Sequence, residues 1–296
     1  MTKSTSASIK AEAEIARNLE SLSTQQREFI LQTFERPGDY VLLSLRQVAR
    51  KLGVDPSTFL RWLRVVGFHQ YAEFRAYLHE RSITQATSIE ALEKTPHDTG
   101  LPALVRNSIQ GDLKNLHALE NLIEPARLLT LARKLWSARR IVILAGDMSA
   151  SLGVYLEYTL SMIGFDATNA ATPGEMVHRT RSVQKSDVVI AITYGRGHIY
   201  TIGALTQAAR KGAFCAGISD SYLSPIAELC NEFFITPTDR VSFATSYTSA
   251  MAFVNAVLVV IASLRKQSLY PLLQEISEEQ RTGDRFYQRN RVAERS

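Results

Sequence analysis

The chain has 296 residues, of which 45% are hydrophobic and 21% charged, a balance typical of globular proteins. This composition excludes disorder throughout, and the length predicts two domains, because single domains usually hold about 100 to 150 residues. Lysine and arginine number 34 against 29 acidic residues, and the net charge of +5 permits a nucleic-acid partner without requiring one.

Cysteine usage and hydropathy predict a reduced cytoplasmic protein. Cys215 and Cys230 are too few for a disulfide framework or a structural zinc site. Residues 1–23 lack the apolar core of about 7 to 15 residues that a secretory signal needs. The most apolar stretch, residues 250–264, contains Asn255 and is shorter than the roughly 20 residues that span a bilayer. We therefore expect a cytoplasmic protein with no membrane partner, metal or cofactor, whose apolar stretch is a buried helix.

Three short helices are predicted near the N-terminus, over residues 24–34, 44–52 and 56–66. The second begins at Ser44, where Gln47 is placed for a capping box, and it ends at Gly53. The third follows Asp55, a capping residue, and has proline at its first helical position. Two short helices joined by a glycine turn are typical of a helix-turn-helix, whose second helix enters the DNA major groove.

The charge of this segment favours DNA as its partner. Between residues 44 and 64, five basic residues stand against one acidic residue, a net charge of +4. Surface arginines are more often only solvated, so the prediction depends on the charges and the helical layout together. We predict that a double-stranded DNA operator is contacted by Arg46, Gln47, Ser57, Thr58, Arg61 and Arg64.

The next segment predicts a linker and a connecting helix. Residues 82–100 are polar, and from residue 101 to residue 136 leucines recur at helical spacing in two pieces that separate near Glu124 and Pro125. These leucines either pack onto the same chain or pair two subunits, and the sequence leaves both alternatives open.

From residue 140 the pattern changes to short apolar runs separated by helical segments. The runs are residues 141–145, 166–170, 188–194, 213–219 and 233–236. Several of these runs are continuously apolar and rich in β-branched residues, which predicts a parallel sheet that is covered on both faces. The fold class is therefore an all-α helix-turn-helix domain followed by a doubly wound α/β domain with a parallel five-stranded sheet.

The loops after the first and third strands predict a ligand site. In doubly wound sheets, ligands bind at the carboxyl ends of the strands, where helix N-termini offer N–H groups to anions. Hydroxyl groups can add hydrogen bonds to a phosphate there, and an arginine can add a bidentate contact. The predicted ligand-binding residues are Ser149, Ser151, Thr193, Gly195, Arg196 and His198.

Two regions resemble a known family. Residues 44–61, with Gly67-Phe68 and the following Tyr71-Ala72-Glu73-Phe74, resemble the N-terminal domain of RpiR-type transcriptional regulators. In that family a helix-turn-helix precedes a sugar isomerase (SIS) domain, and residues 187–194, 218–227 and 246–252 are close to the SIS pattern. The resemblance covers most of residues 22–264. It implies a flavodoxin-like sheet and a sugar-phosphate ligand that changes how a homodimer or homotetramer holds DNA.

Two loops depart from the family's pattern. The first loop of the family commonly reads Gly-x-Gly-x-Ser, whereas Ala145 and Asp147 stand at the glycine positions before Ser149. Asp147 places a negative charge near the proposed phosphate. The second loop, commonly Ser-x-Ser-Gly-x-Thr, is replaced here by residues 193–198. The identity of the ligand therefore stays open.

Two alternatives to a regulator remain. A sugar-phosphate isomerase needs a base beside the sugar, for which Glu175, His178 and His198 are candidates, but the DNA-binding module weighs against an enzyme. Alternatively, the SIS domain only dimerises a DNA-binding protein. We predict a regulator with no catalytic residues. The predicted domains are a helix-turn-helix domain (1–81), a linker and connecting helix (82–124), a SIS domain (125–268) and a polar basic tail (269–296).

Overall fold

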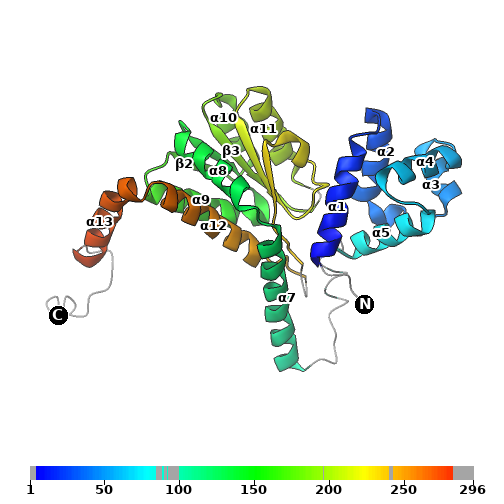
Figure 1. The fold of residues 1–296 in the computed structure, drawn as a ribbon, viewed down its shortest axis with the longest axis horizontal. Coiled ribbons are helices and arrows are strands. Elements are labelled where there is room, and N and C mark those ends of the chain that lie inside the picture. The colour runs from blue at the N-terminus through cyan, green and yellow to red at the C-terminus, as the bar shows by residue number, and fades with distance from the viewer. Residues whose placement is uncertain are drawn as a thin grey trace.

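The structure is a computed structural model that describes residues 5–84, 89, 92, 100–195, 197–239 and 243–282. A helical part comes first in the chain and an α/β part follows, and Figure 1 shows helix α1 (Thr5–Leu19) lying between them. The predicted fold class is confirmed, because helices precede a sheet of five strands that all run parallel.

The helical part is held together by an aromatic core. Its other elements are α2 (Thr24–Glu35), the 3-10 turn η1 (Pro37–Asp39), α3 (Leu45–Leu52), α4 (Pro56–Val66) and α5 (Tyr71–Thr84). Phe74 of α5 packs edge-on against Phe59 of α4 with their ring centroids 5.7 Å apart, and its ring lies 6.2 Å from that of Phe34 in α2. All three rings are fully buried, so burial of aromatic surface compensates for the marginal stability of such short helices.

The sheet has the strand order β2-β1-β3-β4-β5. Its strands are β1 (Ile141–Leu144), β2 (Ala167–Ala170), β3 (Val188–Ile192), β4 (Phe214–Ser219) and β5 (Glu232–Ile235). This is the flavodoxin-like order, in which the direction of winding reverses between β1 and β3. The loops that follow β1 and β3 therefore leave the sheet at the position where ligands of doubly wound proteins bind.

Helices cover both faces of the sheet. They are α8 (Pro125–Ser137), α9 (Ala150–Met162), α10 (Pro173–Arg181), α11 (Ile199–Arg210) and α12 (Thr248–Leu264). Ile141 and Ile143 of β1 pack into a core with α8, α9 and α12, whereas Val142 and Leu144 pack into a second core with α10 and α11. The alternation of side chains along a strand thus explains why the apolar runs are continuous.

Two further helices flank this part. Helix α7 (Leu101–Leu122) precedes α8 and contacts α12, while α13 (Lys266–Thr282) follows α12. Among the described helices, none alone has the length and apolarity to cross a membrane, and only α12 and α13 taken together would, although they meet at a bend of 111°.

Two glycines inside helices are expected to respond to alanine in opposite directions. A Cβ on Gly153 of α9 would lie 2.5 Å from Asn169 Oδ1 and 2.7 Å from the Ala145 Cβ, so G153A should cost about 1–3 kcal/mol of stability through overpacking. A Cβ on Gly203 of α11 would meet no atom within 4 Å, so G203A should stabilise by about 0.5–1 kcal/mol through helix propensity. Urea unfolding measures both, and shifts of the same sign would contradict the close approach of α9 to the sheet.

Candidate functional site

Helices α3 and α4 form the helix-turn-helix. Ser44 and Gln47 make the predicted capping box, in which the Gln47 side chain accepts a hydrogen bond from the Ser44 N–H at 2.8 Å. Gly53 ends α3 with a φ of 70°, a left-handed conformation that glycine adopts without strain. Asp55 caps α4 by accepting from the N–H groups of Ser57 and Thr58. The Ser57 hydroxyl also donates to Asp55, and this bond, followed by the two backbone bonds, lowers the pKa of Asp55.

The predicted DNA-binding residues lie on the outer surface of this motif. Arg46, Arg61 and Arg64 are exposed, and within the described part of the chain none of the three makes an ion pair. Ser57 and Gln47 are exposed, but each also forms a cap hydrogen bond, and Thr58 is half-buried. The arginines are therefore the side chains of this set that are available to an anionic partner.

At the sheet, the loop after β1 is bonded to the end of β3. The Ser149 hydroxyl is buried and donates to the carbonyls of Gly146 at 2.7 Å and Ile192 at 3.0 Å, so it joins that loop to the last residue of β3. The Thr193 hydroxyl accepts from the His198 N–H at 3.0 Å and closes the second loop at the start of α11. Both hydroxyls thus shape the loops, and Ser151 on the exposed surface donates to the Met148 carbonyl.

The centre of the second loop is bonded to the carboxylate of Asp220, a contact that was not predicted from the sequence. Gly195 is exposed, has a φ of 61°, and donates its N–H to Asp220 Oδ1 at 3.0 Å. Thr238 donates to the other oxygen of Asp220 at 3.2 Å. Asp220 follows β4 and Thr238 follows β5, so three strand ends contribute to one group of contacts.

Two tyrosines line the same edge of the sheet. The rings of Tyr194 and Tyr247 lie 5.0 Å apart, and the Tyr194 hydroxyl shares a hydrogen bond of 2.8 Å with Thr236. Burial raises the pKa of Tyr247 to about 12, and the charges of Asp220 and Asp147 add to the rise. Both carboxylates therefore lie within electrostatic reach of this ring.

The two loops also contain Asp147, which departs from the family pattern, and the two remaining predicted ligand residues, His198 and Arg196. Asp147 adopts a φ of 52°, so it keeps the left-handed conformation that suits the glycine of the family pattern, and its side chain is exposed. His198 precedes α11, and its Nδ1 is buried without a hydrogen-bond partner among the described residues. Arg196 lies outside the described residues.

The candidate base Glu175 is occupied by a structural role. It lies in the first turn of α10, where its carboxylate accepts from the N–H groups of Ala171 at 3.0 Å and Thr172 at 2.9 Å. The hydrogen bonds from Thr172 and Ala171 lower the pKa of Glu175. A carboxylate that is both bonded and more acidic than usual is a poor general base. His178 lies on the exposed face of the same helix.

Comparisons with known proteins match the α/β part to a SIS domain and most of the chain to a transcriptional regulator. A family model described as the SIS domain matches residues 134–260. An uncharacterized HTH-type transcriptional regulator of Haemophilus influenzae is 25% identical over 210 residues, which are 69% of this chain and 72% of that protein.

Solved structures extend the likeness. The sugar isomerase domain of an RpiR transcription factor from Sphaerobacter thermophilus is 23% identical with a TM-score of 0.57, and the match covers 61% of this chain and 99% of that domain. The Vibrio vulnificus NanR protein, solved in complex with ManNAc-6P, is 19% identical with a TM-score of 0.57, over 90% of this chain and 97% of NanR. The chain thus contains a SIS domain over residues 134–260 and is similar to an HTH-type transcriptional regulator over most of its length, with the fold of the RpiR and NanR structures.

Proposed function

We propose that this protein is a cytoplasmic transcriptional regulator that binds a DNA operator through α3 and α4 and adjusts that binding when its SIS domain takes up a phosphorylated carbohydrate. The observation that carries the proposal is the joint presence, on one chain, of exposed arginines on a helix-turn-helix and a glycine loop at the switch point of a SIS sheet. The proposed domains are those predicted from the sequence, with residues 1–81 holding DNA and residues 125–268 holding the ligand.

Each predicted DNA contact has a role that fits its position. Arg61 and Arg64, on one exposed face of α4, supply charge to phosphates or base edges in the major groove. We assign Arg46 on α3 to the sugar-phosphate backbone. Gln47, Ser57 and Thr58 lie in the first turns of α3 and α4, where they take part in the cap hydrogen bonds.

The ligand contacts are proposed at the second loop. The N–H of the exposed Gly195, which is bonded to Asp220 in the structure, is the donor that we assign to a phosphate oxygen, and Thr193 bonds within the same loop. Arg196 supplies the positive charge, and Ser151 of α9 and His198, the residue before α11, are the further proposed contacts. NanR was solved with ManNAc-6P, which supports a phosphorylated sugar as the class of effector.

Binding without turnover fits the site better than isomerisation. The acidic residue that the sequence offers as a base, Glu175, is bonded to the backbone at the start of α10. Together with the DNA-binding module, this favours a sensor over an enzyme.

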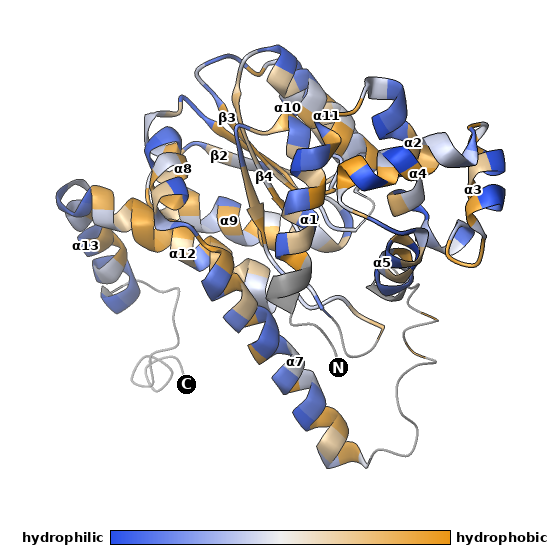
Figure 2. Ribbon diagram, turned by 45° about the vertical axis from the view of Figure 1, so that its right-hand side comes forward, coloured by the Kyte–Doolittle hydropathy of each residue, from blue (hydrophilic) through white to orange (hydrophobic). Residues whose placement is uncertain are grey.

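We also propose that the protein is a homo-oligomer, since a two-fold dimer matches a palindromic operator. The N-terminal half of α7 projects from the α/β part, as Figure 2 shows. Leu101, Val105 and Ile109 of this half, with Leu113 just after it, are exposed and lie four residues apart. Such a stripe suits a second copy of the chain. Sedimentation equilibrium is expected to give at least twice the chain mass, and the mass of one chain would refute the oligomer.

A thermal-shift screen tests the ligand half of this function. A panel of sugar phosphates, amino-sugar phosphates and unphosphorylated sugars should contain a compound that raises the Tm, since a ligand at a hundred times its Kd stabilises by about 2.7 kcal/mol. T193V removes the hydroxyl that accepts from His198 and should lose this shift. T206V, which removes a hydroxyl bonded to the Ile202 carbonyl within α11, is the matched control and should keep it. An equal shift in both variants would place the ligand elsewhere.

A further inference from the structure

Helix α1 and residues 219–223 join the helical part of the molecule to the α/β part. Ile9 of α1 packs into the α/β core, whereas Ile15 and Leu19 of the same helix pack into the helical core. From the other side, Leu223 in the segment after β4 packs against the helical core. The two parts therefore share one boundary, at which α1 lies between them (Figure 1).

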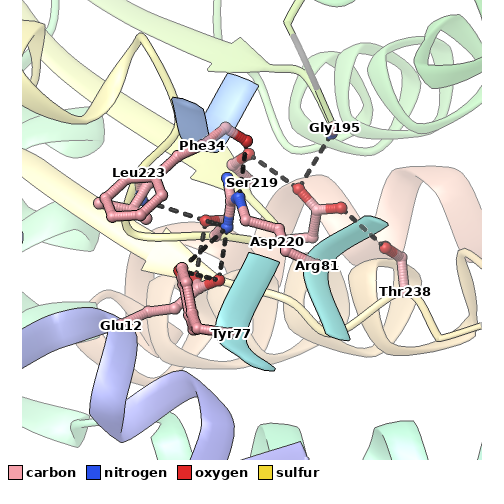
Figure 3. A network of polar contacts seen from close by, with 10 residues as sticks. Glu12, Phe34, Tyr77, Arg81, Gly195, Ser219, Asp220, Leu223 and Thr238 are labelled. Atoms are coloured by element: carbon pink, nitrogen blue, oxygen red, sulfur yellow. Dashed lines mark hydrogen bonds and ion pairs between the residues drawn. The ribbon is translucent and has the colours of Figure 1, made fainter. Parts of the chain in front are cut away.

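Polar side chains at this boundary form a buried network, which Figure 3 shows. One oxygen of the Glu12 carboxylate accepts from Arg81 of α5 at 2.6 Å, and the other accepts from the Ser221 hydroxyl at 2.7 Å. The side chains of Arg81 and Glu12 are only 9% and 13% exposed. Arg81 also donates to the Phe34 carbonyl at 2.9 Å. The network thus ties α1, α2 and α5 to one serine of the α/β part.

The residue before that serine is bonded to the ligand site. Asp220 accepts from the Gly195 N–H and from Thr238, and Figure 3 shows its carboxylate pointing toward both. The carboxylate therefore occupies the N–H group that an anionic part of a ligand would use. Two anions on one donor repel each other, so an anion that binds Gly195 must displace Asp220.

We propose that residues 219–223 are a switch, through which an anionic group bound at Gly195 changes the docking of the helix-turn-helix part on the SIS domain. The inference rests on the proposed function. When a phosphate takes the Gly195 N–H, Asp220 moves away and the adjoining Ser221 leaves Glu12 and Arg81. A buried ion pair that loses a hydrogen-bond partner is destabilised, so the boundary rearranges. If the boundary has two arrangements, a ligand that binds one of them better shifts the populations of the two conformations.

Electrostatics also connects the two ends of the switch. Burial raises the pKa of Glu12, and the charge of Asp220 adds to that rise, while Arg81 and Ser221 oppose it. Displacement of Asp220 therefore changes the field at Glu12 as well as the position of Ser221. Because coupling is reciprocal, loosening the network is expected to strengthen anion binding.

The test uses the full chain with inorganic phosphate as the probe. Calorimetry measures phosphate affinity, and hydrogen exchange measures protection of α1 and α5. In the wild type, phosphate should speed exchange in both helices. D220N removes the competing charge and should bind phosphate at least about tenfold more tightly. In S221A, the backbone amides of α5 should exchange rapidly before phosphate is added, and their exchange rate should change little afterwards. S21A, which loses an exposed hydroxyl bonded to the Asn18 carbonyl, is the control and should behave as wild type.

Several results would overturn the switch. They are an unchanged phosphate affinity in D220N, a response of α5 in S221A equal to that of the wild type, or no phosphate binding by either the wild type or D220N. The proposed function has a separate readout, which is the response of operator affinity to a phosphorylated sugar. If that response is intact in S221A, the switch is wrong and the function stands. If the wild type lacks the response, the function itself fails.

Discussion

Replacing Arg61 by alanine is expected to weaken operator binding by about 5- to 150-fold, because one arginine contact to a base edge contributes about 1–3 kcal/mol. Arg61 is exposed on α4, the helix that enters the major groove in this motif, and it has no ion pair among the described residues. The variant should fold normally, since the α4 core is formed by Phe59, Leu63 and Val66 on its buried face.

Fluorescence anisotropy with DNA fragments selected by the wild-type protein measures this effect. If Arg61 contacts a phosphate, the salt dependence of binding should fall by about one counterion, whereas a base contact should relax sequence preference at one position. R210A is the matched control, because Arg210 is an exposed arginine at the end of α11, away from the helix-turn-helix. Equal affinity and equal salt slope in the R61A and wild-type proteins would remove α4 from the DNA interface.

Replacing Asp187 by asparagine is expected to destabilise the SIS domain by about 1.5–3 kcal/mol, the usual contribution of a hydrogen bond to a charged group, because the carboxylate is buried while Arg139 is partly exposed. Asp187 precedes β3, is 1% exposed, and accepts two hydrogen bonds of 2.8 Å from Arg139. Arg140 and the Gln184 N–H donate to it as well, at 3.1 Å and 2.9 Å. An asparagine has one acceptor oxygen in place of two charged ones, so several of these donors lose their partner.

Urea unfolding checks this prediction. E278Q is the control, because Glu278 also pairs with an arginine, Arg281, but its side chain is 58% exposed. That exposed pair should contribute less than about 1 kcal/mol. If the two variants unfold at the same urea concentration, the carboxylate before β3 does not stabilise the sheet.

The stability that the Asp187 carboxylate contributes is expected to depend on pH. Burial alone would raise the pKa of Asp187, but the hydrogen bonds from Arg139, Gln184 and Arg140 outweigh it and lower the pKa. A lowered pKa contributes stability above the unfolded value of about 4 and loses it as the pH falls through the folded value. The difference in unfolding free energy between wild type and D187N should therefore be largest near neutral pH and narrow below about pH 5. A difference that is constant with pH would contradict this assignment.

The sheet was predictable because most of its strands are apolar runs bounded by polar residues, although β2 carries Thr168 and Asn169 in its middle. The observed strand Phe214–Ser219 begins one residue after the predicted start, and the other bounds agree to within about two residues. Helix α1 was not predicted, and its packing explains why. Ile9 faces one core while Ile15 and Leu19 face another, so the helix lacks the single apolar stripe by which amphipathic helices are found.

At the candidate site, the sequence located the loops but not the bonds within them. Thr193 and Gly195 follow a predicted strand, which places them at the ligand-binding edge of a parallel sheet. Asp220 follows the next strand, so the same rule places it at that edge, but its bond to Gly195 depends on how two loops 25 residues apart fold. Nor does the sequence show that the Ser149 hydroxyl bonds to two carbonyls.

The measurement that tests the central claim most directly is the operator affinity of the full chain, with and without the phosphorylated sugar that raises its Tm. We expect the sugar to change the Kd for operator DNA by about 5- to 150-fold, and the DNA to change the Kd for the sugar by the same factor, because linkage is reciprocal. A sugar that binds the protein but leaves operator affinity unchanged would contradict the account, since the SIS domain would then not regulate DNA binding.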